Sequence, residues 1–390
     1  MATIVYIITK LELGGAQKVC LSLLDGVPQY FGHSALLISG TQGPLVRQVR
    51  EQKNVILLET LTREVKFIAL WREIKTFFVL IKQLRVLKKQ YPDIIVHTHS
   101  TKAGLLGRWA AFFAGIKKRV HTVHGFGFND FQPKIIWFII YFFELVTSSI
   151  TTHFVCVSQA DIDTGIKLFP RFKNKCSLIR AAVDWQQFYQ PARKISHIGM
   201  QPLDTHQLQA AQKIPPFIFG TVACFKKQKN LFDLLLAFET VYQKHPQAKL
   251  EIIGDGALRL ALEEWVQKHQ VAHAVVFHGW QERVAPIAQY WHAFVLTSLW
   301  EGLPCAVVEA RLLKLPVISY KTGGIPEVIH DHVNGLLYEQ KDWQSLASGM
   351  IKLIEQPKLY QQLSGYHDNL KSFQDNFMIE RHAELYRQLG

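Results

Sequence analysis

The feature that most constrains the fold is an alternation of short apolar, β-branched runs with longer amphipathic segments, which occurs twice along the 390 residues. The apolar runs have the length of buried strands, and the segments between them have helical spacing. Strands that alternate with helices favour parallel sheets covered by helices on both faces. The sequence therefore predicts an α/β protein with two Rossmann-like, doubly wound domains that face each other across a central cleft.

The alternation assigns each expected element to a stretch of sequence. Strands are expected over residues 4–9, 34–39, 94–98, 119–123, 153–158, 217–223, 249–253, 275–278, 293–297, 316–319 and 335–338. The expected helices include residues 16–24, 67–90, 104–114, 135–150, 230–245, 257–269 and 305–313. Proline-containing residues 191–216 lack a long apolar run and are expected to be a linker. We therefore expect an N-terminal domain over 1–190, a C-terminal domain over 217–370, and a last helix over 371–390 that packs back on the N-terminal domain.

The cysteines and the first residues indicate the compartment. Five cysteines lie far apart with no Cys-x-x-Cys pair, which excludes a disulfide framework or a zinc knuckle and fits a reducing cytosol. The N-terminal residues have the pattern of a buried strand and lack the basic start and small-residue cleavage site of a signal peptide. A cytoplasmic protein is therefore expected.

Charge is distributed unevenly between the two halves. Residues 1–195 contain 26 Lys and Arg against 12 Asp and Glu, a net charge of +14, whereas the remaining residues have a net charge of −1. Positive surface attracts the phosphates of nucleic acid or of an anionic membrane. No nucleic-acid-binding motif is visible, and the basic residues accompany apolar helical patterns, which argues against nucleic acid as the partner.

Two helical segments of the first half are unusually apolar. Residues 67–90 combine bulky apolar side chains with many basic ones, and residues 135–150 are more apolar still. The second segment is shorter than the roughly 20 residues that cross a bilayer, and it contains Glu144, so a transmembrane helix is not expected. Its composition favours a core helix under the sheet, and insertion at a membrane surface stays open as the alternative.

The most specific chemical signal is a pair of glutamates, Glu301 and Glu309, with E-x7-E spacing directly after an expected strand. If a helix begins near Pro304, its free backbone N–H groups form an anion site at the end of that strand. Glu309 would lie about one turn inside this helix, where a carboxylate can accept hydrogen bonds from a diol such as ribose. Glu301 would lie at the loop tip, where it can reach another polar ligand.

Seven further motifs accompany the E-x7-E loop. They are Leu13-Gly-Gly-Ala-Gln17, His97-Thr-His-Ser-Thr-Lys-Ala-Gly104, His121-Thr-Val-His-Gly125, Val157-Ser-Gln159, Gly254-Asp-Gly256, Phe277-His-Gly-Trp280 and Lys321-Thr-Gly-Gly-Ile-Pro-Glu327. Together with the E-x7-E loop, they resemble the retaining nucleotide-sugar glycosyltransferases of GT-B fold (group 1, family 4). The resemblance covers nearly the whole chain, and the motifs that begin at His97, His121 and Val157 also look like those of bacterial surface-polysaccharide and lipid-linked oligosaccharide transferases of this family.

The resemblance implies a role for each matching residue. Glu309 would hold the nucleotide ribose, Glu301 would contact the donor sugar, Lys229 would neutralise the departing diphosphate, and His124 would lie near the reacting centre. His124 and Glu301 are thus the expected catalytic residues. The expected donor-binding residues are Gly14, Gly15, Lys229, Gly254, Gly256, His278, Gly302, Leu303, Cys305 and Glu309, and His99 and Lys102 are expected on the acceptor side.

Two positions depart from the family pattern. Cys224 stands where the family usually has an arginine, so Lys226 or Lys227 would have to supply the second cation, or diphosphate binding is weaker. Residues 179–184 replace the usual Pro-Asn-Gly-Val-Asp at the domain junction.

The reaction implied by the resemblance is transfer of a hexose or N-acetylhexosamine, with retention, from a UDP-sugar to a polyprenyl-diphosphate-linked saccharide. No metal or cofactor besides the donor is expected, because Asp161-Ile-Asp163 has the position of a helix start and not that of a metal site. The enzyme would be peripheral on an anionic inner membrane face. A soluble acceptor, a sugar-nucleotide epimerase of the same fold and an inactive binder remain alternatives.

Overall fold

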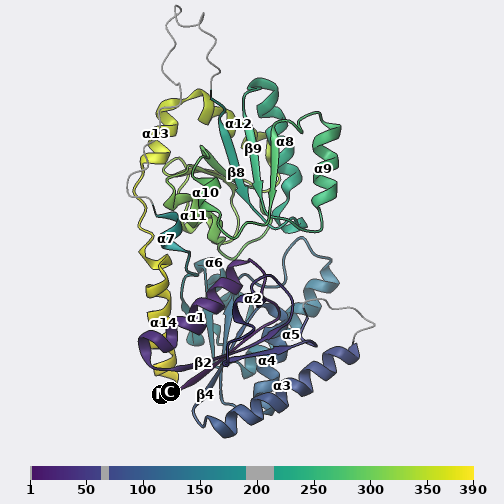
Figure 1. The fold of residues 1–390 in the computed structure, drawn as a ribbon, viewed down its shortest axis with the longest axis vertical. Helices are drawn as coiled ribbons and strands as arrows, with labels where there is room; N and C mark the ends of the chain where they lie inside the picture. Colours follow the sequence, from purple (N-terminus) through teal and green to yellow (C-terminus); the bar gives the residue numbers. More distant parts are fainter. Residues whose placement is uncertain (1, 63–69, 190–214) are drawn as a thin grey trace, which may run out of the picture. The chain divides into compact units, whose positions relative to one another are not determined.

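A computed structural model describes residues 2–62, 70–189 and 215–390. It divides into two compact units, one made of Met1–Val183 with Lys371–Gly390 and the other of Asp184–Leu370 (Figure 1). The start of the helix expected from residue 67 and most of the linker expected over 191–216 lie outside the described residues.

The first unit is built on seven parallel strands in the order β3-β2-β1-β4-β5-β6-β7. The strands are β1 (Thr3–Ile8), β2 (Ser34–Gly40), β3 (Val55–Leu58), β4 (Ile94–His99), β5 (Lys118–Val123), β6 (His153–Cys156) and β7 (Cys176–Leu178). Its helices are α1 (Gly15–Phe31), α2 (Val46–Val49), α3 (Leu70–Gln90), α4 (Thr101–Phe113), α5 (Lys134–Ile150), α6 (Gln159–Leu168), η2 (Phe172–Lys175), η6 (Lys371–Phe373) and α14 (Asp375–Leu389). Helix α4 packs between α3 and α5, and the C-terminal helix α14 packs on α1 (Figure 1).

Helix α1 is longer than its sequence predicts. The expected helix ended at residue 24, yet the helix continues through Gly26 and Pro28 to Phe31. A Cβ atom at Gly26 would lie 2.3 Å from Ile379 of α14. The missing side chain therefore permits the close approach of the two helices, and this packing outweighs the low helix propensity of glycine.

The second unit is built on six parallel strands in the order β10-β9-β8-β11-β12-β13. The strands are β8 (Ile218–Val222), β9 (Lys249–Ile253), β10 (Val275–Gly279), β11 (Ala293–Leu296), β12 (Val317–Tyr320) and β13 (Gly335–Tyr338). Its helices are α7 (Trp185–Phe188), η4 (Lys227–Lys229), α8 (Leu231–Lys244), α9 (Arg259–Lys268), α10 (Ala285–Ala288), α11 (Cys305–Leu312), η5 (Ile325–Glu327), α12 (Trp343–Glu355) and α13 (Pro357–Gly365). Each unit thus has the expected doubly wound, parallel α/β architecture.

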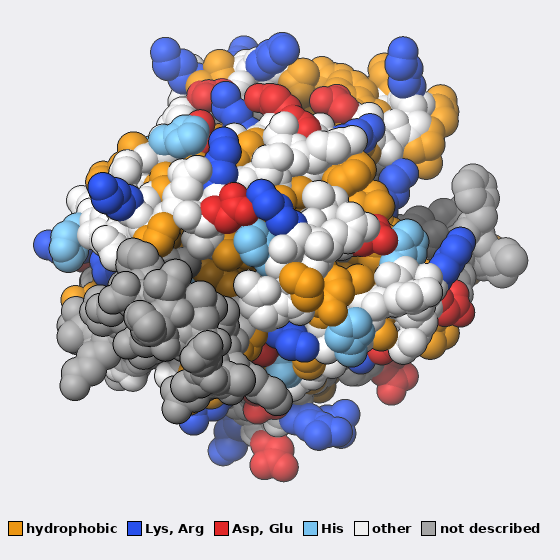
Figure 2. Space-filling model, turned by 90° about the horizontal axis from the view of Figure 1, so that it is seen from above, with side chains coloured by type: hydrophobic (Ala, Val, Ile, Leu, Met, Phe, Trp, Pro, Cys, Tyr) orange, Lys and Arg blue, Asp and Glu red, His pale blue; other side chains and the backbone are white. Residues whose placement is uncertain are grey.

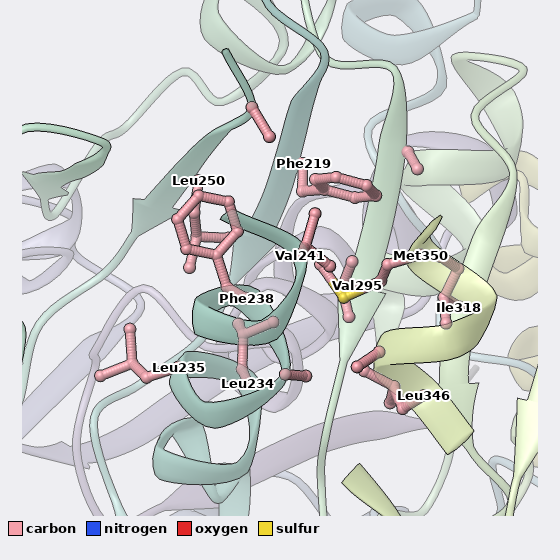
Figure 3. Packing of buried hydrophobic residues seen from close by; sticks show 14 of the residues in the cluster. Phe219, Leu234, Leu235, Phe238, Val241, Leu250, Val295, Ile318, Leu346 and Met350 are labelled. Atoms are coloured by element: carbon pink, nitrogen blue, oxygen red, sulfur yellow. The ribbon is translucent and has the colours of Figure 1, made fainter. Parts of the chain in front are cut away.

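The core of the second unit lies between its sheet and helices α8 and α12. Figure 3 shows Phe238 and Val241 of α8 and Met350 of α12 packed against Phe219 and Val295 of the sheet. All five side chains are fully buried. This packing holds β8 and β11 as neighbours, so the loops that follow these two strands begin side by side.

The chain passes from one unit to the other between Val183 and Asp184, earlier than the boundary expected at residue 190. Asp184 caps the short helix α7, which packs on α11 of the second unit. The side-chain oxygen of Gln187 accepts hydrogen bonds from the backbone N–H groups of Val284 and Ala285, at 3.0 and 3.2 Å. These contacts within the second unit explain why residues 184–189 belong to it.

Helix α5 is only partly a core helix. Trp137, Tyr141 and Leu145 pack against buried phenylalanines, as the core interpretation expects. The opposite face of α5 is exposed and carries large apolar side chains, including Ile135 and Phe138 at 65% and 56% exposure. The core interpretation therefore accounts for one face of this helix and fails for the other.

Candidate active site

In the second unit, a basic loop and an acidic loop meet at the switch point of the sheet. Strand β8 pairs with β9 on one side and with β11 on the other, and ligands of doubly wound folds bind beyond the carboxyl ends of such strands. Lys229 follows β8 and Glu301 follows β11, and Lys229 Nζ lies 2.5 Å from Glu301 Oε1. The structure thus joins two of the predicted site residues in one ion pair.

The chain around this ion pair is held by hydrogen bonds between the two loops. The Thr297 hydroxyl donates to the carbonyl oxygens of Lys229 and Asn230, each at 3.0 Å. The Gln228 side-chain amide donates to the carbonyl of Trp300 at 2.8 Å. Because polar groups of each loop satisfy those of the other, the backbone that carries Lys229 and Glu301 is held in place.

The loop after β9 lies close to the loop after β8. Gly254 has a φ of +129°, and a Cβ atom there would lie 1.9 Å from the carbonyl oxygen of Ala223. The Phe225 N–H donates to the carbonyl of Asp255 at 2.9 Å, and the Gly256 N–H donates to Oδ1 of Asp255. Gly254 is therefore required for this close backbone approach, which places Gly254 and Gly256 beside the segment that leads to Lys229.

The E-x7-E loop leads into α11, which begins at Cys305 with Pro304 as its N-cap. The Gly324 N–H donates to the carbonyl of Gly302 at 2.6 Å, and a Cβ atom at Gly323, where φ is +52°, would lie 2.1 Å from the carbonyl oxygen of Glu301. The Gly323-Gly324 turn thus supports the loop directly. The start of α11 presents backbone N–H groups beyond the end of β11, where an anion can bind.

Glu309 lies one turn inside α11 and is 9% exposed. It contributes to a small pocket of the second unit, together with Val222, Val284, Ala306 and Ala310. The Leu303 side chain is buried, and that of Cys305 is half-buried. Of these expected donor-binding residues, Glu309 is therefore the one that lines a pocket made mostly of apolar side chains.

The remaining expected donor-site residues of this unit are less tightly connected to the ion pair. His278 Nε2 lies 3.1 Å from a carboxylate oxygen of Glu251, and the same oxygen accepts a hydrogen bond from Trp291. Lys226 is the N-cap residue of the η4 turn and is half-buried, and Lys227 is the first residue of this turn and is exposed. The structure therefore ties His278 to β9, whereas the two lysines lie within three residues of Lys229.

In the first unit, the expected catalytic histidine follows β5 and contacts a second expected site residue. His124 Nε2 lies 3.1 Å from His99 Nδ1, at the end of the neighbouring strand β4. The His99 ring stacks on that of His97 at 4.6 Å, and His97 Nδ1 lies 2.7 Å from the hydroxyl of Tyr386 in α14. A continuous row of polar rings therefore connects His124 to the C-terminal helix.

These imidazoles are neutral at ordinary pH. Burial, with a smaller contribution from the charge of His382, lowers the pKa of His124 to about 4. Burial also lowers the pKa values of His97 and His99 well below the usual range, and that of His382 to about 4. A neutral imidazole can both donate and accept hydrogen bonds, which suits sugar hydroxyls.

The other expected residues of the first unit lie at neighbouring strand ends. Gly14 and Gly15 form the start of α1 after β1, and the hydroxyls of Thr9 and Ser100 connect the ends of β1 and β4 at 3.3 Å. Lys102, in the first turn of α4, forms an ion pair with Glu73 of α3 at 2.6 Å. The glycine-rich turn and His99 thus share one edge of the sheet.

Comparison with known proteins identifies the family. Residues 13–187 match the pattern of "Glycosyltransferase Family 4", and residues 205–369 match that of "Glycosyl transferases group 1". An Escherichia coli protein named UDP-Gal:alpha-D-GlcNAc-diphosphoundecaprenol alpha-1,3-galactosyltransferase is 30% identical over 347 residues, which cover 88% of this chain and 85% of that protein. The chain belongs to the group 1, family 4 glycosyltransferases. Another relative of this glycosyltransferase is the Staphylococcus aureus capsular polysaccharide biosynthesis glycosyltransferase CapM, 23% identical over 80% of this chain and 78% of the relative.

Solved structures establish the fold of this glycosyltransferase. The crystal structure of Anabaena HepE in complex with UDP and glucose superposes with a TM-score of 0.77 at 18% identity, covering both chains completely. Two parallel-sheet, Rossmann-like units with such neighbours confirm the expected GT-B fold. The prediction that the two units enclose a cleft stays a prediction.

Two further observations concern membranes and metals. None of the helices described in this glycosyltransferase is both long and apolar enough to cross a membrane. Within residues 2–62, 70–189 and 215–390, no group of three His, Cys, Asp or Glu side chains is arranged to hold a metal ion. Asp161 lies in the first turn of α6, where its N–H donates to the side chain of the N-cap residue Ser158, as expected for a helix start.

Sequence reasoning missed several residues that support the site. Gln228 and Thr297 fix the loops around Lys229, and a search for polar residues at the ends of adjacent strands would have found them. His382 and Tyr386 reach the histidine row from α14. Their i, i+4 spacing predicts a shared helix face, but nothing in the sequence tells which surface that face contacts.

Proposed function

We propose that this glycosyltransferase moves a hexose or N-acetylhexosamine, with retention of configuration, from a UDP-sugar to a polyprenyl-diphosphate-linked saccharide in bacterial surface-polysaccharide biosynthesis. The observation that carries the proposal is the ion pair of Lys229 and Glu301 at the switch point, next to the start of α11 and Glu309. The E. coli relative supports the choice of donor and acceptor, since its name specifies UDP-Gal and a diphosphoundecaprenol-linked GlcNAc.

In this proposal the second unit holds the donor. The diphosphate lies over the start of α11, with Lys229 as a point cation, and Glu309 accepts hydrogen bonds from the ribose. When the diphosphate engages Lys229, Glu301 is released from its ion pair and turns to hydroxyls of the donor sugar. The ion pair thus keeps both charges compensated until the donor arrives.

The chemical step breaks the bond between the anomeric carbon and the diphosphate oxygen and forms a bond from that carbon to the acceptor hydroxyl on the same face. The acceptor proton passes to the departing diphosphate oxygen, so UDP leaves and no covalent glycosyl-enzyme forms. Lys229 and the N–H groups of α11 stabilise the charge that develops on the leaving group, and therefore no metal ion is required. Neutral His124 would hydrogen-bond the reacting sugar.

The test uses the full chain with a panel of UDP-hexoses and UDP-N-acetylhexosamines and a polyprenyl-diphosphate-linked GlcNAc acceptor, with and without a chelator. The expected result is a glycolipid with the same anomeric configuration as the donor, formed at an unchanged rate in chelator. An inverted product would disprove retention, and loss of activity in chelator would disprove metal independence.

The same panel separates the alternatives. Transfer to a free saccharide but not to the glycolipid identifies a soluble acceptor. Isomerisation of a UDP-sugar without acceptor identifies an epimerase. A UDP-sugar that raises the thermal unfolding temperature without any turnover identifies an inactive binder.

A further inference from the structure

The exposed face of α5 is the most unusual surface of the first unit. Its large apolar side chains recur at helical spacing, and each is between 40% and 65% exposed. They are Ile135, Ile136, Phe138, Ile139, Phe142, Phe143 and Val146. Contiguous apolar surface of this kind marks a binding face, because soluble proteins rarely leave it in water.

Helix α5 is anchored to its own unit by its inner face. Glu144 accepts a hydrogen bond from buried Arg108 at 2.8 Å, and Thr147 accepts one from the Trp109 indole at 2.9 Å. The Tyr141 hydroxyl donates to the carbonyl of Leu168 at 3.1 Å. Because these polar contacts hold the inner face in place, the apolar face remains exposed in the part of the chain that the structure describes.

The apolar surface continues across α4 to α3. Phe112 and Phe113 end α4 at 44% and 52% exposure, and Phe113 packs edge to face on Phe77 of α3. Arg119 stacks on Phe112 and donates to the carbonyl of Ile150 at the end of α5. Trp71, Ile74 and Phe78 add exposed apolar side chains on α3. The three helices therefore form one outer layer.

Basic side chains accompany this layer, and acidic ones are withdrawn from it. The exposed basic residues of α3 are Lys75, Lys82, Arg85, Lys88 and Lys89. The acidic residue of α3, Glu73, pairs with Lys102, and that of α5, Glu144, pairs with Arg108. On the face of the molecule in Figure 2, basic and acidic side chains are interspersed. On α3 and α5, by contrast, the side chains that the structure describes as exposed include no Asp or Glu.

We propose that the outer layer of α3, α4 and α5 is a docking surface for an anionic lipid bilayer, with α5 lying in the plane of the interface. Aromatic and aliphatic side chains would enter the boundary between headgroups and acyl chains, and the lysines and arginine of α3 would contact the headgroups. This rests on the proposed function in one respect: a lipid-linked acceptor explains why such a surface exists.

The dimensions favour an interfacial position over a spanning one. Seventeen residues of α5 extend about 25 Å, less than the roughly 30 Å of a bilayer core. The inner face of the helix, moreover, is committed to Arg108 and Trp109. Only the outer half of α5 is available to lipid.

Charge distinguishes a bilayer from a second copy of the chain as the occupant. A symmetric dimer buries the same patch on both subunits, so it would bring the basic residues of α3 from both copies into one interface, to which α3 and α5 contribute no exposed acidic side chain. An anionic membrane complements these charges instead. The bilayer is therefore the occupant that satisfies both the apolar and the basic parts of the surface.

The test is co-flotation of the full chain with phosphatidylcholine vesicles that contain or lack phosphatidylglycerol. We expect flotation only with the anionic lipid at low salt. Replacing Phe138 and Phe142 by glutamine should reduce the vesicle-bound fraction about tenfold. The matched control replaces Leu260 and Tyr290, which are 73% and 67% exposed in the second unit, and should float like the parent.

The basic part of the surface is tested by charge removal. Replacing Lys82, Arg85 and Lys89 together by glutamine should weaken binding on the order of 100-fold at low salt and much less at high salt. The control replaces Lys268, Lys352 and Lys358, three exposed lysines of the second unit, and should have no comparable effect. Unchanged thermal unfolding excludes misfolding as the cause.

Three results would overturn the docking surface: a parent chain that does not float, a Phe138/Phe142 variant that floats equally well, or a parent dimer that this variant dissociates in the absence of vesicles. Failure of the proposed function has a different signature. A chain that floats but transfers sugar to no acceptor retains the docking surface and refutes the activity. A chain that transfers sugar in detergent but never floats retains the activity and refutes the docking surface.

Discussion

The two units differ in the polar groups that they place at the ends of their strands. In the second unit these groups are charged and paired, as in Lys229 and Glu301. In the first unit they are neutral imidazoles, since burial lowers the pKa values of His97, His99 and His124 below the usual range. One fold architecture thus supports two kinds of electrostatic environment.

The difference matches the proposed division of labour. A departing diphosphate is stabilised by a cation. In the ion pair, Glu301 compensates the charge of Lys229 until the diphosphate binds. A neutral sugar is held by oriented hydrogen-bonding groups. Uncharged histidines supply these groups and do not compete with Lys229 for the phosphate. The comparison predicts that charge changes in the second unit affect catalysis most, and that protonation affects chiefly the first unit.

The largest expected effect is that of Lys229→Ala. Losing the cation that faces the leaving group should lower kcat by about 10²- to 10³-fold. Lys226→Ala and Lys227→Ala should cost activity too, but less, because neither is held against Glu301 in the structure. Steady-state kinetics of the three variants measure this order.

The Lys229→Ala variant also leaves Glu301 without its cation. A Lys229→Ala/Glu301→Gln double variant removes the unpaired carboxylate, and it should regain any lost thermal stability without regaining activity. Full activity of Lys229→Ala would refute the placement of the diphosphate at this residue.

The glutamates of the E-x7-E loop provide the next effect. Glu309→Ala should weaken UDP-sugar binding by about 1.5 to 3 kcal/mol, since the ribose loses a charged acceptor. Glu301→Ala should mainly reduce turnover. His124→Ala is the control from the other unit, and should lower turnover while donor affinity measured by calorimetry stays the same. Unchanged affinity in Glu309→Ala, with unchanged rates in Glu301→Ala, would show that the loop is not the donor site.

Acid should destabilise the first unit. His124 and His382 have pKa values of about 4 in the folded chain, against about 6.5 when unfolded. Between these values the unfolded chain binds more protons, so the contribution of these two histidines to the free energy of unfolding falls as the pH drops from about 6.5 to about 4, and this contribution is constant above about 6.5. We expect the unfolding temperature to fall by about 10 °C between pH 7 and pH 5.

Hydrogen exchange, corrected for its intrinsic pH dependence, identifies where the protection is lost. The expected loss lies in β4, β5 and α14, which carry the histidine row. An equal loss of protection in the strands of the second unit would contradict the inference that acid acts chiefly on the first unit.

Local patterns were sufficient to predict most of the fold. Apolar runs bounded by polar residues located the main strands to within one or two residues, and β13 coincides with the expected 335–338. The sequence did not predict β3 or β7, which are short. It also ended α1 too early, because the approach of α14 to Gly26 depends on residues more than 300 positions away.

The local structure of the candidate site was predictable where it depends on nearby residues and obscure where it depends on packing, and the roles of its residues stay predictions. The spacing of Glu301 and Glu309 predicted a helix start with two carboxylates, and α11 begins at Cys305. The partner of Lys229 and the contact between His99 and His124 arise from neighbouring strands, whose order an isolated sequence does not state. The exposed face of α5 was obscure for a related reason: apolar composition is the same for a buried and for a lipid-facing helix.

The smallest expected effect is that of Cys224→Arg, which restores the residue that the family usually has. Cys224 is half-buried and follows β8, and its carbonyl oxygen accepts a hydrogen bond from the Lys226 N–H at 2.8 Å, so the backbone does not depend on the thiol. An added guanidinium would supply a second cation for the diphosphate, and we expect wild-type or modestly higher donor affinity, with a change in free energy of unfolding within about 0.5 kcal/mol.

In a Lys226→Ala background the same arginine should restore activity, since it would replace the cation that compensates for Cys224. Calorimetry and kinetics on the four chains of this cycle measure the coupling between the two positions. If Cys224→Arg abolishes donor binding, the loop after β8 does not hold the diphosphate, and the charged pair of the second unit would need another explanation.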